Sequence, residues 1–124
     1  MKVELFAPAS FWTLDEGELK QLRCGPGRGL LELLVPETIY GLRITTACAI
    51  HDFMYRLGGN DKDKCEADDV FLNNMIRIIE AHTKNRVVLW ARLKRAQLYY
   101  QVVRNFGGPA FWMGKNKQSE LGVI

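Results

Sequence analysis

Three consecutive segments of this chain carry apolar side chains at helical spacing. They run from about Thr45 to Leu57, from about Asp63 to about His82, and from about Asn85 to Phe106. Offsets of three and four residues place side chains on one face of a helix, and glycines follow the first and the third segment. We therefore expect an all-α domain of three main helices. A short turn of about six residues between the first two makes them antiparallel neighbours.

The rest of the chain predicts loops and one short helix. Recurring leucines behind acidic residues predict a short helix at Asp15–Arg23, and Pro36 predicts a loop with one helical turn within Leu30–Gly41. No convincing alternation of apolar and polar residues predicts a strand. The run CGPGRG at residues 24–29 excludes regular structure, so a shaped glycine-rich loop precedes the first long helix.

The chain has 124 residues, of which 48% are hydrophobic, as in one soluble globular domain. We expect a single domain over residues 1–124, with a core at 22–106 that bears the motifs and a tail at 107–124. The N-terminus lacks the apolar stretch of a secretory signal, and no window reaches the ~18 apolar residues of a membrane span. The default location is therefore the cytoplasm. A protein carried in a particle or released by lysis would share these features.

Charge is unevenly distributed along the chain. The segment Lys84–Lys117 holds eight basic residues and no acidic one, whereas the first 83 residues hold nine basic and thirteen acidic ones. A basic third suggests contact with the phosphates of lipid headgroups or nucleic acid, and the alternative is a solvated helix face. Aromatic and basic residues also mix in the tail, as suits a lipid interface or a tail docked on the core. They are Arg104, Phe106, Phe111, Trp112, Met113, Lys115 and Lys117.

The first two helices carry polar side chains on the faces that we expect to be buried. His51 and Tyr55 lie four residues apart and share a face. Asp68 heads an otherwise apolar stripe on the second helix, made of Phe71, Leu72, Met75 and Ile79. A buried carboxylate needs partners, and His51 and Tyr55 offer them. Such an Asp–His pair leaves the other ring nitrogen as a general base, and the alternative is a pair that only locks two helices.

Asp52 follows His51 and points about 100° around the helix. A carboxylate together with carbonyls of a glycine-rich loop is the kind of ligand set that Ca²⁺ prefers. A rival is a zinc site formed by Cys24, Cys48, Cys65 and His51, although the usual C-x-x-C pair is missing. His82, the other histidine, is expected near the C-terminal end of the second helix, where it favours the helix dipole.

Three of these elements resemble the phospholipases A2, and their viral and bacterial members most. They are CGPG at 24–27, CAIHDFMY at 48–55 and ADDVF at 67–71. They are similar, in the same order, to a glycine-rich calcium loop, a C-x-x-H-D-x-x-Y helix and a downstream A/C-D-x-x-F. The resemblance covers about residues 22–76 and implies calcium-dependent hydrolysis of the sn-2 ester of phospholipids at a lipid interface. Basic and aromatic residues also suit single-stranded nucleic acid, but no binding fold supports that, so we expect no nucleic-acid partner.

The resemblance also assigns roles to individual residues. It implies that His51 activates the attacking water, that Asp68 orients His51, and that Tyr55 bonds to Asp68. The implied ligands of one Ca²⁺ are the Asp52 carboxylate and the backbone carbonyls of Arg23, Gly25 and Gly27. The N–H of Gly25 would help to hold the oxyanion.

The resemblance implies a disulfide between Cys24 and Cys48 and leaves Cys65 as the odd thiol. Arg28 stands where the animal enzymes have a second glycine, and Pro26 stiffens the loop. The segment His51–Phe106 also resembles small phage and bacterial proteins of no assigned activity. The rival function is therefore a structural or assembly component of a phage or bacterial particle, and the oligomeric state stays open.

Overall fold

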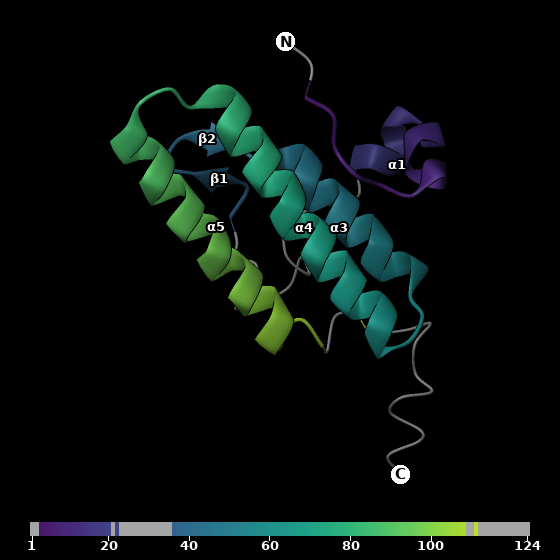
Figure 1. The fold of residues 1–124 in the computed structure, drawn as a ribbon. Coiled ribbons are helices and arrows are strands. Elements are labelled where there is room, and N and C mark those ends of the chain that lie inside the picture. Colours follow the sequence, from purple (N-terminus) through teal and green to yellow (C-terminus); the bar gives the residue numbers. More distant parts are fainter. Residues whose placement is uncertain (1–2, 21, 23–35, 109–110, 112–124) are drawn as a thin grey trace.

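The computed structural model describes residues 3–20, 22, 36–108 and 111 (Figure 1). Its elements are the 3-10 helix η1 (Ala9–Thr13), the helix α1 (Glu16–Lys20), the strands β1 (Thr38–Ile39) and β2 (Leu42–Arg43), and the helices α3 (Thr45–Leu57), α4 (Asp61–His82) and α5 (Arg86–Phe106). The three long helices are those that the periodicity predicts. The expected all-α class is therefore confirmed.

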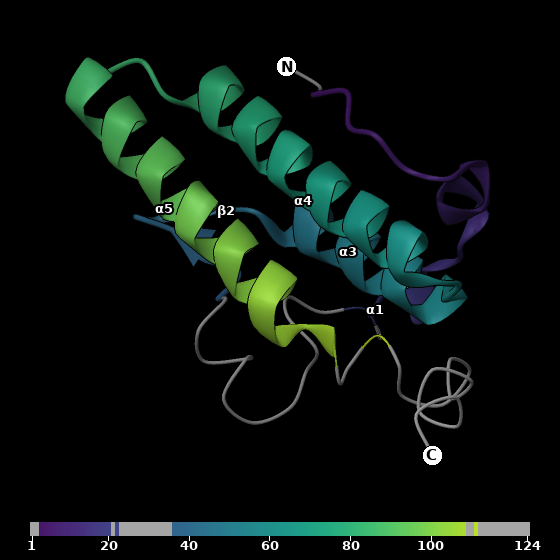
Figure 2. The ribbon, with the colours of Figure 1, turned by 60° about the horizontal axis from the view of Figure 1, so that its bottom comes forward.

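Helix α4 lies between α3 and α5 and packs against both (Figures 1 and 2). Three residues separate α3 from α4, and three separate α4 from α5. Connections this short make consecutive helices antiparallel neighbours. The N-terminal half of α4 therefore lies beside the C-terminal ends of both α3 and α5. None of the helices in the described ranges has the length and apolar character of a membrane span.

The helix ends follow from local hydrogen bonds. Gly58 ends α3 with a positive φ of 74°, a conformation that glycine adopts without strain. Asn60 begins α4 with a capping box, because its Oδ1 accepts from the Asp63 amide while the Asp63 side chain accepts from the Asn60 amide. This box explains why α4 begins two residues before the predicted start. Asn85 caps α5 by accepting from two backbone amides.

The core lies where α4 meets α3 and α5. Its buried residues include Phe71, Met75 and Ile79 of the predicted stripe of α4, and Ile78 beside them. Leu72, Leu89 and Leu93 pack against this core while partly buried. On α5 the buried tyrosine is Tyr99, whereas Tyr100 is only partly buried. The Tyr100 hydroxyl instead donates to Asp69 Oδ1 at the surface, at 2.7 Å.

A small hairpin begins within the segment Leu30–Gly41, where the sequence predicts a loop, and residues 30–35 of that segment lie outside the described residues. Strands β1 and β2 pair antiparallel, with Thr38 opposite Arg43 and Ile39 opposite Leu42. The turn residues Tyr40 and Gly41 have φ of 45° and 83°, which suits a two-residue turn whose twist matches the strands. The expectation of no strand was therefore wrong. Strands of two residues are too short to show an alternating pattern.

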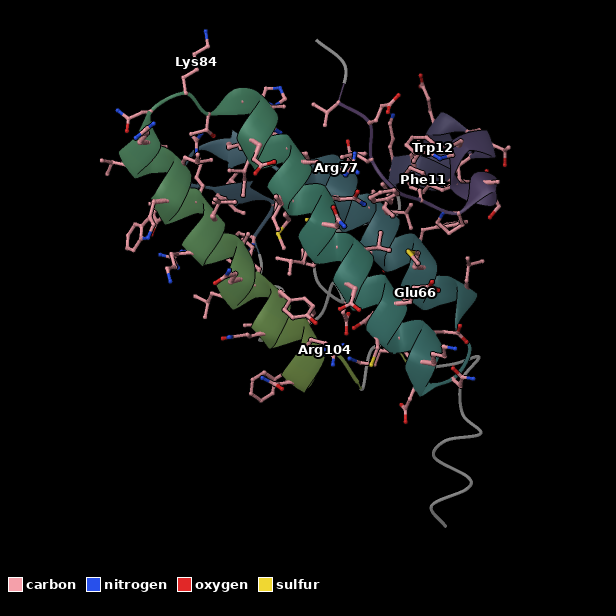
Figure 3. The ribbon with its side chains drawn as sticks, viewed as in Figure 1. Phe11, Trp12, Glu66, Arg77, Lys84 and Arg104 are labelled. Carbon is pink, nitrogen blue, oxygen red and sulfur yellow. The ribbon has the colours of Figure 1, made fainter. Side chains whose placement is uncertain are left out.

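The N-terminal segment is held on α3 and α4. The buried Asn74 side chain exchanges two hydrogen bonds of 2.8 Å with the backbone of Phe6. Phe11 packs on Ala49 and Ile50, and Figure 3 shows it beside α3. Helix α1 covers Glu16–Lys20 of the predicted Asp15–Arg23, of which residues 21 and 23 lie outside the described residues. The predicted glycine-rich loop lies outside the described residues.

Candidate functional site

A buried carboxylate is the centre of the polar cluster in this fold. Asp68 of α4 is 0% exposed, and three side chains donate hydrogen bonds to it. His51 Nε2 lies 2.8 Å and the Tyr55 hydroxyl 2.6 Å from Oδ1, and both come from α3. Lys64 Nζ lies 2.9 Å from Oδ2. The contacts of Asp68 with His51 and Tyr55 are those that the spacing predicts, so this part of the expectation is confirmed.

The charge state of Asp68 fixes the tautomer of His51. Burial by itself raises the pKa of the Asp68 carboxyl. Its interactions with His51, Tyr55 and Lys64 outweigh that effect and lower the pKa below the ordinary 3.8. An ionised carboxylate only accepts hydrogen bonds, so Nε2 of His51 carries the proton in this contact. In the neutral ring, Nδ1 is then the basic nitrogen. The arrangement can act chemically as a general base held by a carboxylate.

His51 is held by aromatic rings as well as by Asp68. The centroid of its ring lies 4.2 Å from that of Tyr55 and 4.6 Å from that of Phe71. Its side chain is 2% exposed. Packing of this kind restricts the imidazole to one orientation and keeps bulk water away from the bond to Asp68.

Tyr55 is fixed from both sides. Burial raises the pKa of its hydroxyl well above the ordinary 10.0, and the Asp68 carboxylate raises that pKa further. The buried Phe111 ring packs edge-on against the Tyr55 ring at 5.3 Å. A Cβ on Gly107 would lie 2.5 Å from the Tyr55 hydroxyl oxygen, so only glycine fits there. Tyr55 therefore stays protonated and donates to Asp68.

Lys64 is the member of this cluster that the sequence analysis misses. A lysine is normally a surface residue, yet its side chain here is only 10% exposed. Its position four residues before Asp68 on the same helix is the spacing of an ion pair, and that signal could have found it. Lys64 Nζ also donates to the backbone carbonyls of Val103 at 3.1 Å and Arg104 at 3.4 Å.

The proposed calcium ligands are described only in part. The Asp52 side chain is only 13% exposed, and its carboxylate lies 3.4 Å from the guanidinium of Arg56 one turn later. The implied carbonyl ligands Arg23, Gly25 and Gly27 lie outside the described residues, as does the implied oxyanion donor of Gly25. Asp52 supplies an oxygen of the kind that Ca²⁺ prefers, and Arg56 competes for it. Among the described residues, no three His, Cys, Asp or Glu side chains group as a metal site.

The cysteines exclude the rival zinc site. Cys48 is disulfide-bonded, so its sulfur is not available as a thiolate ligand. The four-ligand set therefore lacks one of its thiolates, while Cys65 is a free thiol. Cys24, the disulfide partner that the resemblance implies for Cys48, lies outside the described residues.

The other residues that the sequence analysis names, His82 and the aromatic and basic residues near the C-terminus, do not bond to Asp68 where they are described. His82 is the last residue of α4, as expected, and its Nδ1 lies 3.1 Å from the carbonyl oxygen of Ile78. In the aromatic tail, Phe106 is exposed and Phe111 is buried against Tyr55, while Trp112 and Met113 lie outside the described residues. Figure 3 shows Arg104 on the end of α5 that lies beside the N-terminal half of α4.

Comparisons with known proteins add no relative to this geometry. A scan against protein-family models, a search of curated proteins and a search of solved structures each found no match for the chain.

Proposed function

We propose that this protein is a calcium-dependent hydrolase of the sn-2 ester of phospholipids, in which His51 activates the attacking water. The observation that supports this most is the bond of 2.8 Å between His51 Nε2 and the buried carboxylate of Asp68. It joins a histidine of α3 to an aspartate of α4 in the order of the phospholipase A2 elements. Tyr55 completes the arrangement by donating to the same carboxylate oxygen.

In this proposal each residue of the chain has a defined task. Nδ1 of His51 takes a proton from a water molecule as the water oxygen attacks the ester carbonyl carbon. The Asp68 carboxylate stabilises the imidazolium that forms, and Tyr55 keeps the carboxylate in place. The imidazolium then returns its proton to the alkoxide oxygen of the leaving lysophospholipid when the C–O bond breaks.

Asp52 is the residue of the described part that would hold the ion, with the carbonyls of the loop at 23–27 as its proposed partners. Bound Ca²⁺ would polarise the ester carbonyl. Arg56 lies next to Asp52 in the structure, so ion binding would require the Arg56 side chain to give way. The basic α5 and the aromatic tail are the proposed contacts with a phospholipid surface.

The first experiment measures fatty-acid release from mixed phospholipid vesicles with Ca²⁺ and with a chelator. We expect release only with Ca²⁺ and its loss in His51→Ala. His82→Ala is the matched control, because it removes the other histidine from an exposed position at the end of α4. Release that survives His51→Ala, or its absence from the wild-type protein, would refute the proposal.

A structural role is the second candidate, in which the cluster locks three helices of a phage or bacterial particle component. The bonds from Lys64 to the carbonyls of α5 favour it, because they tie α5 to the cluster. The melting temperature with and without Ca²⁺ separates the two candidates, since a ligand at 100 times its Kd adds about 2.7 kcal/mol. A calcium shift that Asp52→Ala abolishes supports the hydrolase, and no shift supports the structural role.

A further inference from the structure

We propose that Lys64 is a positioning residue that makes the His51–Asp68 pair depend on the docked end of α5. The inference rests on the proposed function for its effect on turnover, but its geometry stands independently. One ammonium group contacts the carboxylate that orients His51 and the last turn of another helix. His51 and Asp68 come from α3 and α4. A third helix, α5, contributes to the pair because its last turn holds Lys64.

The hydrogen bonds of the Lys64 ammonium are fully used. A protonated lysine has three donors, and Nζ has three acceptors within reach, namely Asp68 Oδ2, the Val103 carbonyl and the Arg104 carbonyl. The carbonyls belong to the last turn of α5. That of Val103 also accepts from the Gly107 amide at 2.9 Å, and a carbonyl oxygen can accept two hydrogen bonds. A cation at this end also interacts favourably with the helix dipole. Lys64 therefore joins the last turn of α5 to the Asp68 carboxylate.

Lys64 fixes the orientation of the Asp68 carboxylate. Oδ1 accepts from His51 and Tyr55, while among the described side chains only Lys64 donates to Oδ2. A carboxylate held at one oxygen can rotate about its Cβ–Cγ bond, whereas one held at both oxygens cannot. Without Lys64, Oδ2 would be an unpaired charged acceptor in a fully buried position, which is costly. Rotation of the carboxylate to relieve that cost would misalign Nε2 of His51.

A second contact keeps the end of α5 in its place from outside the cluster. Asp69 Oδ1 accepts from the Tyr100 hydroxyl at 2.7 Å and lies 3.7 Å from the Arg104 guanidinium. These groups lie at the surface, one residue along α4 from Asp68. They hold the Val103 and Arg104 carbonyls within reach of Lys64 without touching the buried carboxylate.

The experiment compares Lys64→Met with Lys62→Met, which makes the same change at an exposed position of the same helix. We expect Lys64→Met to lower kcat for vesicle hydrolysis by at least about tenfold with KM within about twofold, as expected for a misplaced catalytic group. Lys62→Met should match the wild type. Lys64→Arg, which keeps the charge and can donate both to Asp68 and to the carbonyls of α5, should restore part of kcat.

A second readout needs no activity. The ring ¹⁵N and ¹H signals of His51 report its bond to Asp68, and they should change in Lys64→Met, change little in Lys64→Arg, and not change in Lys62→Met. If the wild-type protein releases no fatty acid, the proposed function fails while these signals still decide the role of Lys64. Should Lys64→Met not fold, Lys64→Gln replaces it, because its amide fills similar space without the charge. Unchanged His51 signals, or a loss of kcat no larger than the loss of folded protein, would overturn the inference.

Discussion

The N-terminal half of α4 buries two charged groups, a carboxylate and an ammonium. Its C-terminal half buries Met75, Ile78 and Ile79, together with the uncharged side chain of Asn74. Both halves are enclosed by neighbouring helices, yet they are stabilised by different means. Apolar packing has no direction and tolerates changes that conserve volume. A buried ion pair must have every hydrogen bond satisfied, and similar apolar residues often stabilise a fold as well or better. The polar half is thus the part whose residue types stability alone does not explain.

The largest effect should come from removing one partner of the buried pair. Asp68→Ala leaves the Lys64 ammonium buried without a countercharge and takes the acceptor from His51 and Tyr55. We expect the free energy of unfolding to fall by about 3–5 kcal/mol. Urea denaturation followed by circular dichroism measures it.

The double variant Lys64→Met with Asp68→Leu is the control for this prediction. It removes both charges and fills similar space, so we expect it to recover part of the lost stability while vesicle hydrolysis stays absent. The recovery is partial because the His51 N–H and the Tyr55 hydroxyl still lack their acceptor. A double variant as unstable as Asp68→Ala would show that the buried charge is not the cause. Recovered stability with recovered hydrolysis would contradict the role of Asp68.

The sequence predicts the three long helices well, because the signals for a helix are local. Period-3.6 apolar spacing and the glycine after α3 place that helix at its observed bounds, Thr45–Leu57. His51, Tyr55 and Asp68 are found because a polar residue within an apolar stripe is conspicuous. Because of the Asn60 cap, α4 begins at Asp61, two residues before the predicted start at Asp63.

What the sequence does not predict depends on contacts between distant segments. Lys64 is buried only because the last turn of α5 brings two carbonyls to it, 39 and 40 residues away. Asn74 is buried because it pairs with the backbone of Phe6, 68 residues away. Tyr99 and Tyr100 differ by only 100° around α5, and the position of the hairpin decides which is buried, since the Tyr99 hydroxyl donates to the Thr38 carbonyl.

A smaller effect should appear in acid. The pKa of the Asp68 carboxyl is lowered in the folded protein, so its contribution to stability is fully present above the unfolded pKa, about 3.8. That contribution is lost as the pH falls from about 5 through the folded pKa, because protonation breaks the acceptor role of the carboxylate. Urea midpoints measured between pH 7 and pH 3 should fall more steeply for the wild type than for the Lys64→Met, Asp68→Leu double variant. Equal slopes would place the acid sensitivity in other carboxylates.

The smallest effect should come from a conservative change in the apolar half. Met75 is fully buried in the core, and Met75→Leu keeps its volume and its apolar character. We expect a loss of less than about 1.5 kcal/mol in the free energy of unfolding, with vesicle hydrolysis and the His51 ring signals unchanged. A loss as large as that of Asp68→Ala would mean that both halves of α4 tolerate substitution equally poorly. The polar cluster would then depend on exact geometry no more than the apolar core does. A small loss of stability accompanied by changed His51 signals would instead mean that core packing, through Phe71, sets the orientation of the imidazole as strongly as Lys64 does.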